Sequence, residues 1–265
     1  MRQLRKPDLL DEDGIAPEEF SVLDRIQRGR MVGRETEHKQ ATALWSEVLS
    51  GQGRVLMISG EPGIGKSRLV RELTTHAAVT GGWALEGASY AESGSPYGPF
   101  RQVLREVLSK DSETCCDLPQ GVLADVLSLA PELKTQFPDV SANPPLDPQA
   151  ERQRLFEHIV IFFSTLSDHA PLLLILEDAH WADSGTLALM LYLARNTRHK
   201  RLMIVAPYRE VELDEARPFH EVLLDIQREG LAVRLKLNRL TRSQSQDLLG
   251  VLFAEEILPD FLDGI

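Results

Sequence analysis

One continuous apolar run, one glycine-rich loop and one amphipathic helix follow each other in this chain, and this succession constrains its fold more than any other feature. The run is residues 54–59 (RVLMIS), which has the composition of a strand buried on both faces. The loop, residues 60–67 (GEPGIGKS), comes next, and behind it Leu69, Val70 and Leu73 share one face of a predicted helix. A buried strand that passes through a glycine loop into a helix is typical of a parallel α/β sheet.

The loop has the pattern Gly-x-x-x-x-Gly-Lys-Ser, in which each specified residue has a physical task. Glycines let the main chain approach phosphate groups and turn its amides toward them, the lysine reaches the outer phosphates, and the serine hydroxyl ligates magnesium. We therefore predict a phosphate-binding loop with Ser67 as a magnesium ligand. The predicted binding residues are Gly60, Glu61, Pro62, Gly63, Ile64, Gly65, Lys66, Ser67 and Arg68.

Apolar strands and amphipathic helices alternate along the rest of the chain. Such alternation is typical of an α/β fold with a central, mostly parallel sheet. A proline-rich stretch, residues 131–148, interrupts the alternation and is predicted to be an irregular excursion. Further strands are predicted at 83–89, 172–176, 201–209 and 231–237, and helices at 100–108, 155–163, 184–197 and from Thr241 onward.

Two acidic residues, Glu177 and Asp178, directly follow the aliphatic run LLLIL. Nucleotide chemistry needs acid at the tip of a strand that neighbours the phosphate loop, where it holds magnesium and orients a water molecule. A strand that simply ends in solvated acids is the alternative interpretation. The position of the pair downstream of a glycine loop, in an alternating fold, favours the chemical role.

The charge balance and the apolar runs exclude several classes of protein. Twenty-nine basic and forty acidic residues among 265 give a net charge of −11, and a broad nucleic-acid footprint would need a basic face. The longest apolar runs are far too short to span a bilayer, and the charged N-terminus lacks the apolar core of a secretory signal. We expect a soluble, cytoplasmic protein that binds neither a membrane nor nucleic acid directly. The adjacent Cys115 and Cys116 are interpreted as reduced thiols, and no metal beyond magnesium is predicted.

Several segments outside the loop also have a familiar composition, and together they cover most of the chain. They are MVGRETE (31–37), ERQRLFEHIV (151–160), LEDAHWAD (176–183) and VAPYRE (205–210). With GEPGIGKS, they resemble the signal-transduction ATPases of the STAND class, which are cousins of AAA+ and Orc1-like ATPases and often occur in large bacterial regulators. The resemblance implies a P-loop NTPase fold, which is a three-layer α/β sandwich followed by a helical lid.

The resemblance also implies roles for individual residues. Gly33 and Arg34 lie in the segment that packs against the adenine base, although an exposed arginine is the plain alternative for Arg34. Glu177 matches the position that helps to hold magnesium, and Asp178 matches the one that orients the attacking water. Arg209 follows the fourth strand, where the family places an arginine that senses the γ-phosphate. With Lys66, these last three residues are the predicted catalytic group.

The sequence departs from the family pattern at one position, and it covers only the beginning of the expected lid. The first acid at the strand tip is usually aspartate, so Glu177 predicts slow hydrolysis. His180 is interpreted as structural, and Trp181 as equally suited to packing or to contact. The expected division is a linker over residues 1–30, an ATPase domain over 31–238 and the beginning of a helical lid over 239–265.

The leading hypothesis is a slowly hydrolysing switch that binds ATP or ADP with magnesium and controls effector or sensor modules on a longer chain. Nucleotide-dependent self-association would fit such a switch. Alternatives are an Orc1-like DNA-associated ATPase, a nucleotide-binding scaffold without turnover and, more distantly, a small-molecule kinase.

Overall fold

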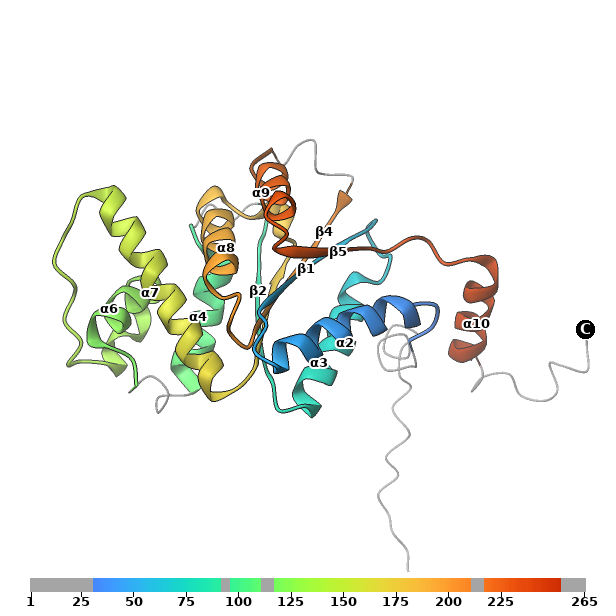
Figure 1. Cartoon of the computed structure of the whole chain (residues 1–265), viewed down its shortest axis with the longest axis horizontal. Coiled ribbons are helices and arrows are strands. Elements are labelled where there is room, and N and C mark those ends of the chain that lie inside the picture. Colours follow the sequence, from blue (N-terminus) through green and yellow to red (C-terminus); the bar gives the residue numbers. More distant parts are fainter. Residues whose placement is uncertain (1–30, 92–95, 111–116, 211–216, 254–265) are drawn as a thin grey trace, which may run out of the picture. The chain divides into compact units, whose positions relative to one another are not determined.

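The predicted apolar runs form one parallel sheet in the computed structural model, which describes residues 31–91, 96–110, 117–210 and 217–253 (Figure 1). Within these residues the sheet has the strand order β2-β3-β4-β1-β5, and every neighbouring pair is parallel. This confirms the predicted α/β fold with a central parallel sheet. The predicted linker and the cysteine pair lie outside the described residues. The strands are β1 (Arg54–Ser59), β2 (Trp83–Ala88), β3 (Leu172–Glu177), β4 (Leu202–Tyr208) and β5 (Ala232–Lys236).

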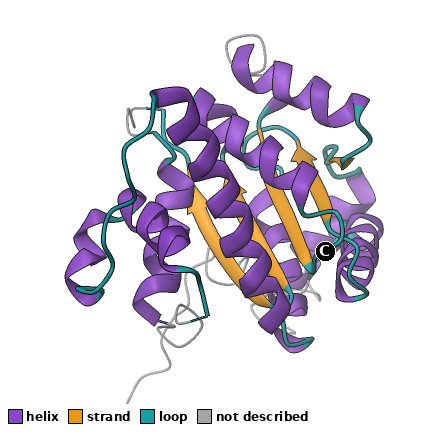
Figure 2. Ribbon diagram, turned by 60° about the vertical axis from the view of Figure 1, so that its left-hand side comes forward, coloured by secondary structure: helices purple, strands orange, loops and turns teal. Residues whose placement is uncertain are grey.

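Helices flank this sheet (Figure 2). All seven residues of β4 and the first five of β3 are buried, and successive side chains of a strand point to opposite faces, so both faces are covered here. The described helices are α2 (Glu35–Leu49), α3 (Lys66–Val79), α4 (Gly98–Lys110), α6 (Gln120–Leu129), α7 (Pro148–His169), α8 (Ser184–Asn196), α9 (Arg217–Arg228) and α10 (Arg242–Phe253), with short 3-10 turns η1 (Pro131–Gln136) and η2 (Ala179–Trp181).

β3 and β4 stop pairing before their carboxyl ends, whereas β1 and β4 remain paired. Pairing between β1 and β4 continues to Ser59 and Tyr208, whereas pairing between β3 and β4 ends at Ile175 and Val205. Pro207 follows in β4 and has no N–H to donate to a neighbouring strand. The end of β3 is therefore unpaired with β4, while its pairing with β2 continues to Glu177 and Ala88.

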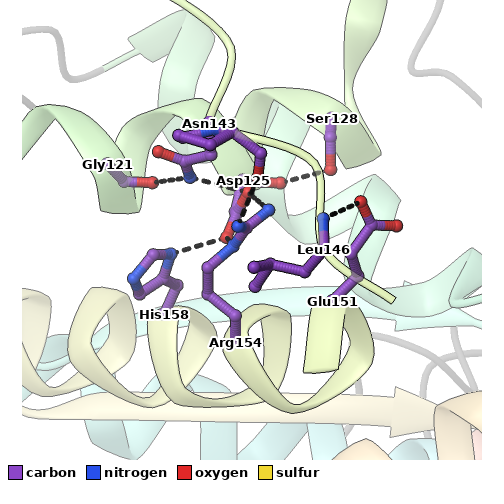
Figure 3. Close-up of polar contacts among 9 residues, drawn as sticks. Gly121, Asp125, Ser128, Asn143, Leu146, Glu151, Arg154 and His158 are labelled. Atoms are coloured by element: carbon purple, nitrogen blue, oxygen red, sulfur yellow. Dashed lines mark hydrogen bonds and ion pairs between the residues drawn. The ribbon is translucent and has the colours of Figure 1, made fainter. Parts of the chain in front are cut away.

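The proline-rich stretch is tied to the body of the protein by a buried carboxylate. Figure 3 shows Asp125 of α6 between two side chains of α7, Arg154 and His158. Its oxygens accept from Arg154 Nε at 2.9 Å and from Asn143 Nδ2 at 2.8 Å, and His158 Nδ1 lies at 2.7 Å. Because Asn143 belongs to the predicted irregular stretch, residues 131–148, this stretch is held against α6 and α7, and its first part forms the 3-10 turn η1 (Pro131–Gln136).

The chain divides into two compact units, and the larger one comprises Arg34–Leu240. The described part of the smaller unit is residues 31–33 and 241–253. In it α10 begins with a reciprocal cap, because Gln244 N donates to Thr241 Oγ1 at 3.3 Å and Thr241 N donates to Gln244 Oε1 at 2.8 Å. The lid expected from residue 239 stays a prediction. Among the helices of the described residues, none combines the length and apolarity that crossing a membrane requires.

Candidate functional site

The glycine loop turns the chain from β1 into α3 with two residues in the left-handed region. Gly63 has φ 73° and Gly65 has φ 104°, and no atom lies within 4 Å of the position that a Cβ would take at either. Glycine is needed at both positions because it adopts positive φ without strain, and the space beside the main chain is open. At Gly60 the need is different, because a Cβ would lie 2.8 Å from Cγ2 of Ile64. The loop is thus tightly packed on one side and open on the other.

Lys66 and the start of α3 supply positive charge to this loop. The Lys66 ammonium donates to the carbonyl oxygens of Gly60 and Glu61, both at 3.0 Å. Since α3 begins at Lys66, the amides of its first turn have no acceptor within the helix and carry the positive end of its dipole. Amides at a helix N-terminus beside an ammonium group form an anion-binding site.

Arg34 is buried and ties this loop to the segment that follows β5. Only 6% of the residue is exposed. Its Nη2 donates to the carbonyl oxygens of Ile64 at 3.1 Å and Asn238 at 2.6 Å, and its Nη1 lies 3.3 Å from the Glu37 carboxylate. The alternative of an exposed arginine is therefore wrong. The predicted packing of Arg34 against a base is untested and stays a prediction.

The remaining predicted phosphate-loop residues lie at the surface or point along α3. Pro62 and Ser67 are exposed. Glu61 forms an ion pair with Arg239 at 2.8 Å, and Arg68 forms one with Glu72 of α3 at 2.6 Å. Their predicted roles toward a nucleotide stay predictions.

Gly33 belongs to the smaller compact unit and has φ 70°. Its carbonyl oxygen accepts from Gln244 Nε2 at 3.5 Å. Its predicted contact with a base is untested and stays a prediction.

The acidic pair lies at the carboxyl end of β3. Glu177 is the last residue of the strand, and Asp178 adopts the left-handed conformation with φ 51°. Burial, with the nearby carboxylates of Glu86 and Asp178, raises the pKa of Glu177 to about 7, and the Lys66 ammonium opposes this rise. The Lys66 ammonium and the Glu177 carboxyl are thus near enough to interact electrostatically.

Arg209 emerges between the loop and the acids, because β4 lies between β1 and β3 in the sheet. Its Nε is 4.0 Å from the Asp178 carboxylate, and its Cζ is 4.7 Å from the ring centroid of Trp181. Glu210, the next residue along the chain, is bound by Arg234 at 2.5 Å and Lys236 at 2.7 Å. The sequence placed Arg209 at the end of its strand, but the stacking on Trp181 is a tertiary contact.

Asp183 has a role that the sequence analysis missed. It caps α8 by accepting from the Thr186 amide at 3.0 Å, and it also accepts from the Tyr97 amide at 3.2 Å. Tyr97 has φ 60°. An aspartate directly before a helix is an N-cap signal that could have revealed the first contact. The contact with the Tyr97 amide joins segments that are far apart in the sequence, so no local signal predicts it.

These side chains fit a magnesium-bound nucleoside triphosphate. Amides and an ammonium group suit phosphate oxygens, and a hydroxyl with carboxylates suits magnesium. Within the described part of the chain, no group of three or more His, Cys, Asp or Glu residues could hold a metal ion. Magnesium in nucleotide sites usually keeps several waters and takes only one or two carboxylates, so this sparse set is compatible with it.

Comparison with known proteins identifies related sequences. A family model described as "AAA ATPase domain" matches residues 30–205, which confirms the resemblance to AAA ATPases. An uncharacterized protein of Rhizobium meliloti (strain 1021) is 27% identical over an alignment of 247 residues, and the match covers 84% of this chain and 23% of that protein. The chain therefore spans about a quarter of the length of this curated relative.

Two solved structures are similar at low sequence identity. Drosophila ORC bound to DNA matches with a TM-score of 0.51 and 14% identity, over 95% of this chain and 55% of the other. A STAND protein with a tetratricopeptide repeat sensor, from Pyrococcus horikoshii, matches with a TM-score of 0.45 and 16% identity, over 92% of this chain and 28% of the other. At such identities the likeness to ORC concerns the fold alone.

Proposed function

Because this chain belongs to the AAA ATPase domain family, we propose that it binds ATP and ADP with magnesium and acts as a nucleotide-dependent switch. The observation that carries the proposal is the meeting of three elements at one end of the sheet. These are the loop with Lys66, the acids at Glu177 and Asp178, and Arg209 between them. Ligands of open α/β folds bind at this carboxyl edge.

In the proposed site each side chain has a separate task. Lys66 and the amides at the start of α3 bind the outer phosphates. Ser67 and Glu177 hold magnesium, which when bound neutralises charge on the phosphates. Asp178 accepts a hydrogen bond from the attacking water and orients it. A cavity of about 410 Å³ beside Gly60, Asn238 and Arg239 offers room for the base and ribose.

Arg209 distinguishes the two nucleotides in this proposal. A guanidinium can give a phosphate two charge-assisted hydrogen bonds, and only ATP presents a γ-phosphate. A ligand shifts a conformational equilibrium only through its differential affinity for the two states. An arginine that reaches the γ-phosphate supplies such a difference.

Nucleotide binding without turnover is a second candidate, and the environment of Glu177 favours it. A carboxyl with a pKa of about 7 is partly protonated near neutral pH, and a protonated carboxyl is a poor magnesium ligand. The chain would then bind nucleotide as a scaffold. Single-turnover hydrolysis measurements separate this candidate from a working ATPase.

The switch would act within a longer protein, since the curated relative is about four times as long as the matched part. We propose that effector or sensor modules on the same chain read the nucleotide state, and that self-association depends on it. Direct binding of nucleic acid by this segment is not part of the proposal, because its net charge is −11.

Calorimetric titration of the purified chain, and of the full-length protein, with ATP and with ADP tests the proposed function. Both nucleotides should bind, and magnesium should strengthen ATP binding. A ligand at one hundred times its Kd should stabilise the fold by about 2.7 kcal/mol, measured as a raised melting temperature. Absence of both heat and stabilisation at millimolar nucleotide in the full-length protein would overturn the proposal.

A further inference from the structure

We propose that Trp181 and Asp178 form a resting cradle for the Arg209 guanidinium, and that Trp181 is thereby a positioning residue that sets the preference for ATP over ADP. The proposal rests on the proposed function of the same site, because the γ-phosphate is the partner that would draw Arg209 out of the cradle. Trp181, which the sequence made equally suited to packing or to contact, would thus act by positioning Arg209.

The cradle includes the Trp181 ring and the Asp178 carboxylate. The Arg209 Cζ lies 4.7 Å from the centroid of the Trp181 ring, which is within the range of a cation–π contact. The Arg209 Nε lies 4.0 Å from Asp178 Oδ1, which is beyond hydrogen-bond distance. Arg209 therefore contacts the face of the ring, and the Asp178 carboxylate lies at the distance of a long ion pair.

The ring is held in place by its surroundings. Trp181 ends η2, whose turn is closed by the Trp181 amide donating to the Asp178 carbonyl oxygen at 2.9 Å. The buried His180 ring lies 4.7 Å from the Trp181 ring at an interplanar angle of 42°. Asp183 then caps α8 and fixes the chain after the turn. Trp181 is thus a fixed platform.

The arginine is the movable partner. Its side chain is 29% exposed, and it extends from the end of β4, whose seven residues are all buried. A γ-phosphate can accept two charge-assisted hydrogen bonds from a guanidinium, which is a stronger pairing than a ring face provides. ATP would therefore release Arg209 from Trp181, whereas ADP would leave it there.

This competition predicts the sign of a substitution effect. If the ring stabilises the resting position, removing it lowers the cost of moving Arg209 to the γ-phosphate. Trp181→Leu should then raise the ratio of ATP to ADP affinity by about two- to tenfold. Trp181→Phe retains a ring and should raise it less. Trp83→Leu is the matched control and should leave the ratio unchanged, since Trp83 starts β2 at the opposite end of the strand.

The test combines calorimetry with ¹⁹F NMR of protein that contains 5-fluorotryptophan. The chain has three tryptophans, and Trp181→Phe assigns the resonance of Trp181. A non-hydrolysable ATP analogue should shift that resonance, ADP should leave it in place, and those of Trp45 and Trp83 should not distinguish the nucleotides. In Arg209→Ala the Trp181 resonance should already be displaced without nucleotide, and the analogue should shift it no further.

The outcomes separate the cradle from the proposed function. If neither nucleotide binds in calorimetry, both proposals fail. If both bind but the Trp181 resonance does not distinguish them, or Arg209→Ala leaves it unmoved, the function stands and the cradle is wrong. A lower ATP preference in Trp181→Leu would also overturn the cradle, because Trp181 would then support the ATP-bound position of Arg209.

Discussion

Arg34 donates a hydrogen bond of 2.6 Å to the carbonyl oxygen of Asn238, a residue 204 positions later in the chain. The same Nη2 also binds the carbonyl oxygen of Ile64 in the glycine loop. One buried guanidinium therefore couples the phosphate loop to the segment after β5. A movement of Ile64 in the loop would therefore act on Asn238 through the Arg34 guanidinium.

Arg34→Ala should destabilise the protein, since it leaves two carbonyl oxygens without their donor. A hydrogen bond to a charged group contributes about 1.5–3 kcal/mol. The free energy of unfolding in urea measures the loss. Arg239→Ala is the control and should change stability little, because the Arg239 side chain is 79% exposed and surface ion pairs contribute about 0–1 kcal/mol. Equal effects of the two substitutions would contradict a structural role for Arg34.

Lys66→Ala should weaken ATP binding by removing the ammonium beside the loop. A charge-assisted contact contributes about 1.5–3 kcal/mol, which corresponds to roughly a ten- to hundredfold loss of affinity. Lys200→Ala removes the same charge from a surface pair with Asp168 and should leave affinity unchanged. Calorimetric titration compares the two variants. Unchanged ATP affinity in Lys66→Ala would show that the loop holds another ligand.

Asp178→Asn should slow hydrolysis far more than it changes nucleotide affinity. Asparagine tolerates the left-handed conformation of this position, so the substitution removes the negative charge with little backbone strain. Losing a group that orients the attacking water should lower the single-turnover rate by about a hundredfold or more. If affinity for Mg-ATP collapses as far as the rate, Asp178 is the main magnesium ligand and the roles of the two acids are reversed.

The stability of the nucleotide-free protein should depend on pH through Glu177. Its pKa is raised to about 7 in the folded protein, against about 4.3 for an unperturbed glutamate. Between these values the folded state holds a proton that the unfolded chain has released, so stability falls as pH rises from about 4.3 to 7 and then levels off.

The control for this pH dependence is Glu177→Gln, which does not titrate. Urea unfolding in the presence of a chelator should show the wild type losing stability relative to the variant across that interval. Parallel stability curves for the two proteins would show that Glu177 is not perturbed.

Arg209→Ala should lower ATP affinity by about 1.5–3 kcal/mol while leaving ADP affinity within about twofold. The physical reason is that the guanidinium reaches a phosphate only when the γ-phosphate is present. Parallel titrations of both nucleotides against wild type and variant measure the two losses. Losses of equal size would make Arg209 a structural residue and leave the γ-phosphate sensor to be found elsewhere.

The sequence by itself determined the local elements of this protein. Uninterrupted apolar runs such as LLLIL predicted buried strands, because a strand covered on both faces has no polar side to alternate with. The loop GEPGIGKS predicted the turn into α3, since Gly63 and Gly65 can adopt positive φ without strain. These properties depend only on residues that are close in the sequence, so the sequence alone is sufficient to predict them.

Only the tertiary structure decided which side chains share the site. The strand order places β4 between β1 and β3, and that order brings Arg209 between the loop and the acids. The burial of Arg34 and the stacking of Arg209 on Trp181 follow from the same arrangement. The raised pKa of Glu177 also arises from burial, with neighbours that include Glu86 on another strand. The periodicity of the sequence does not predict such contacts, because they depend on distances across the fold.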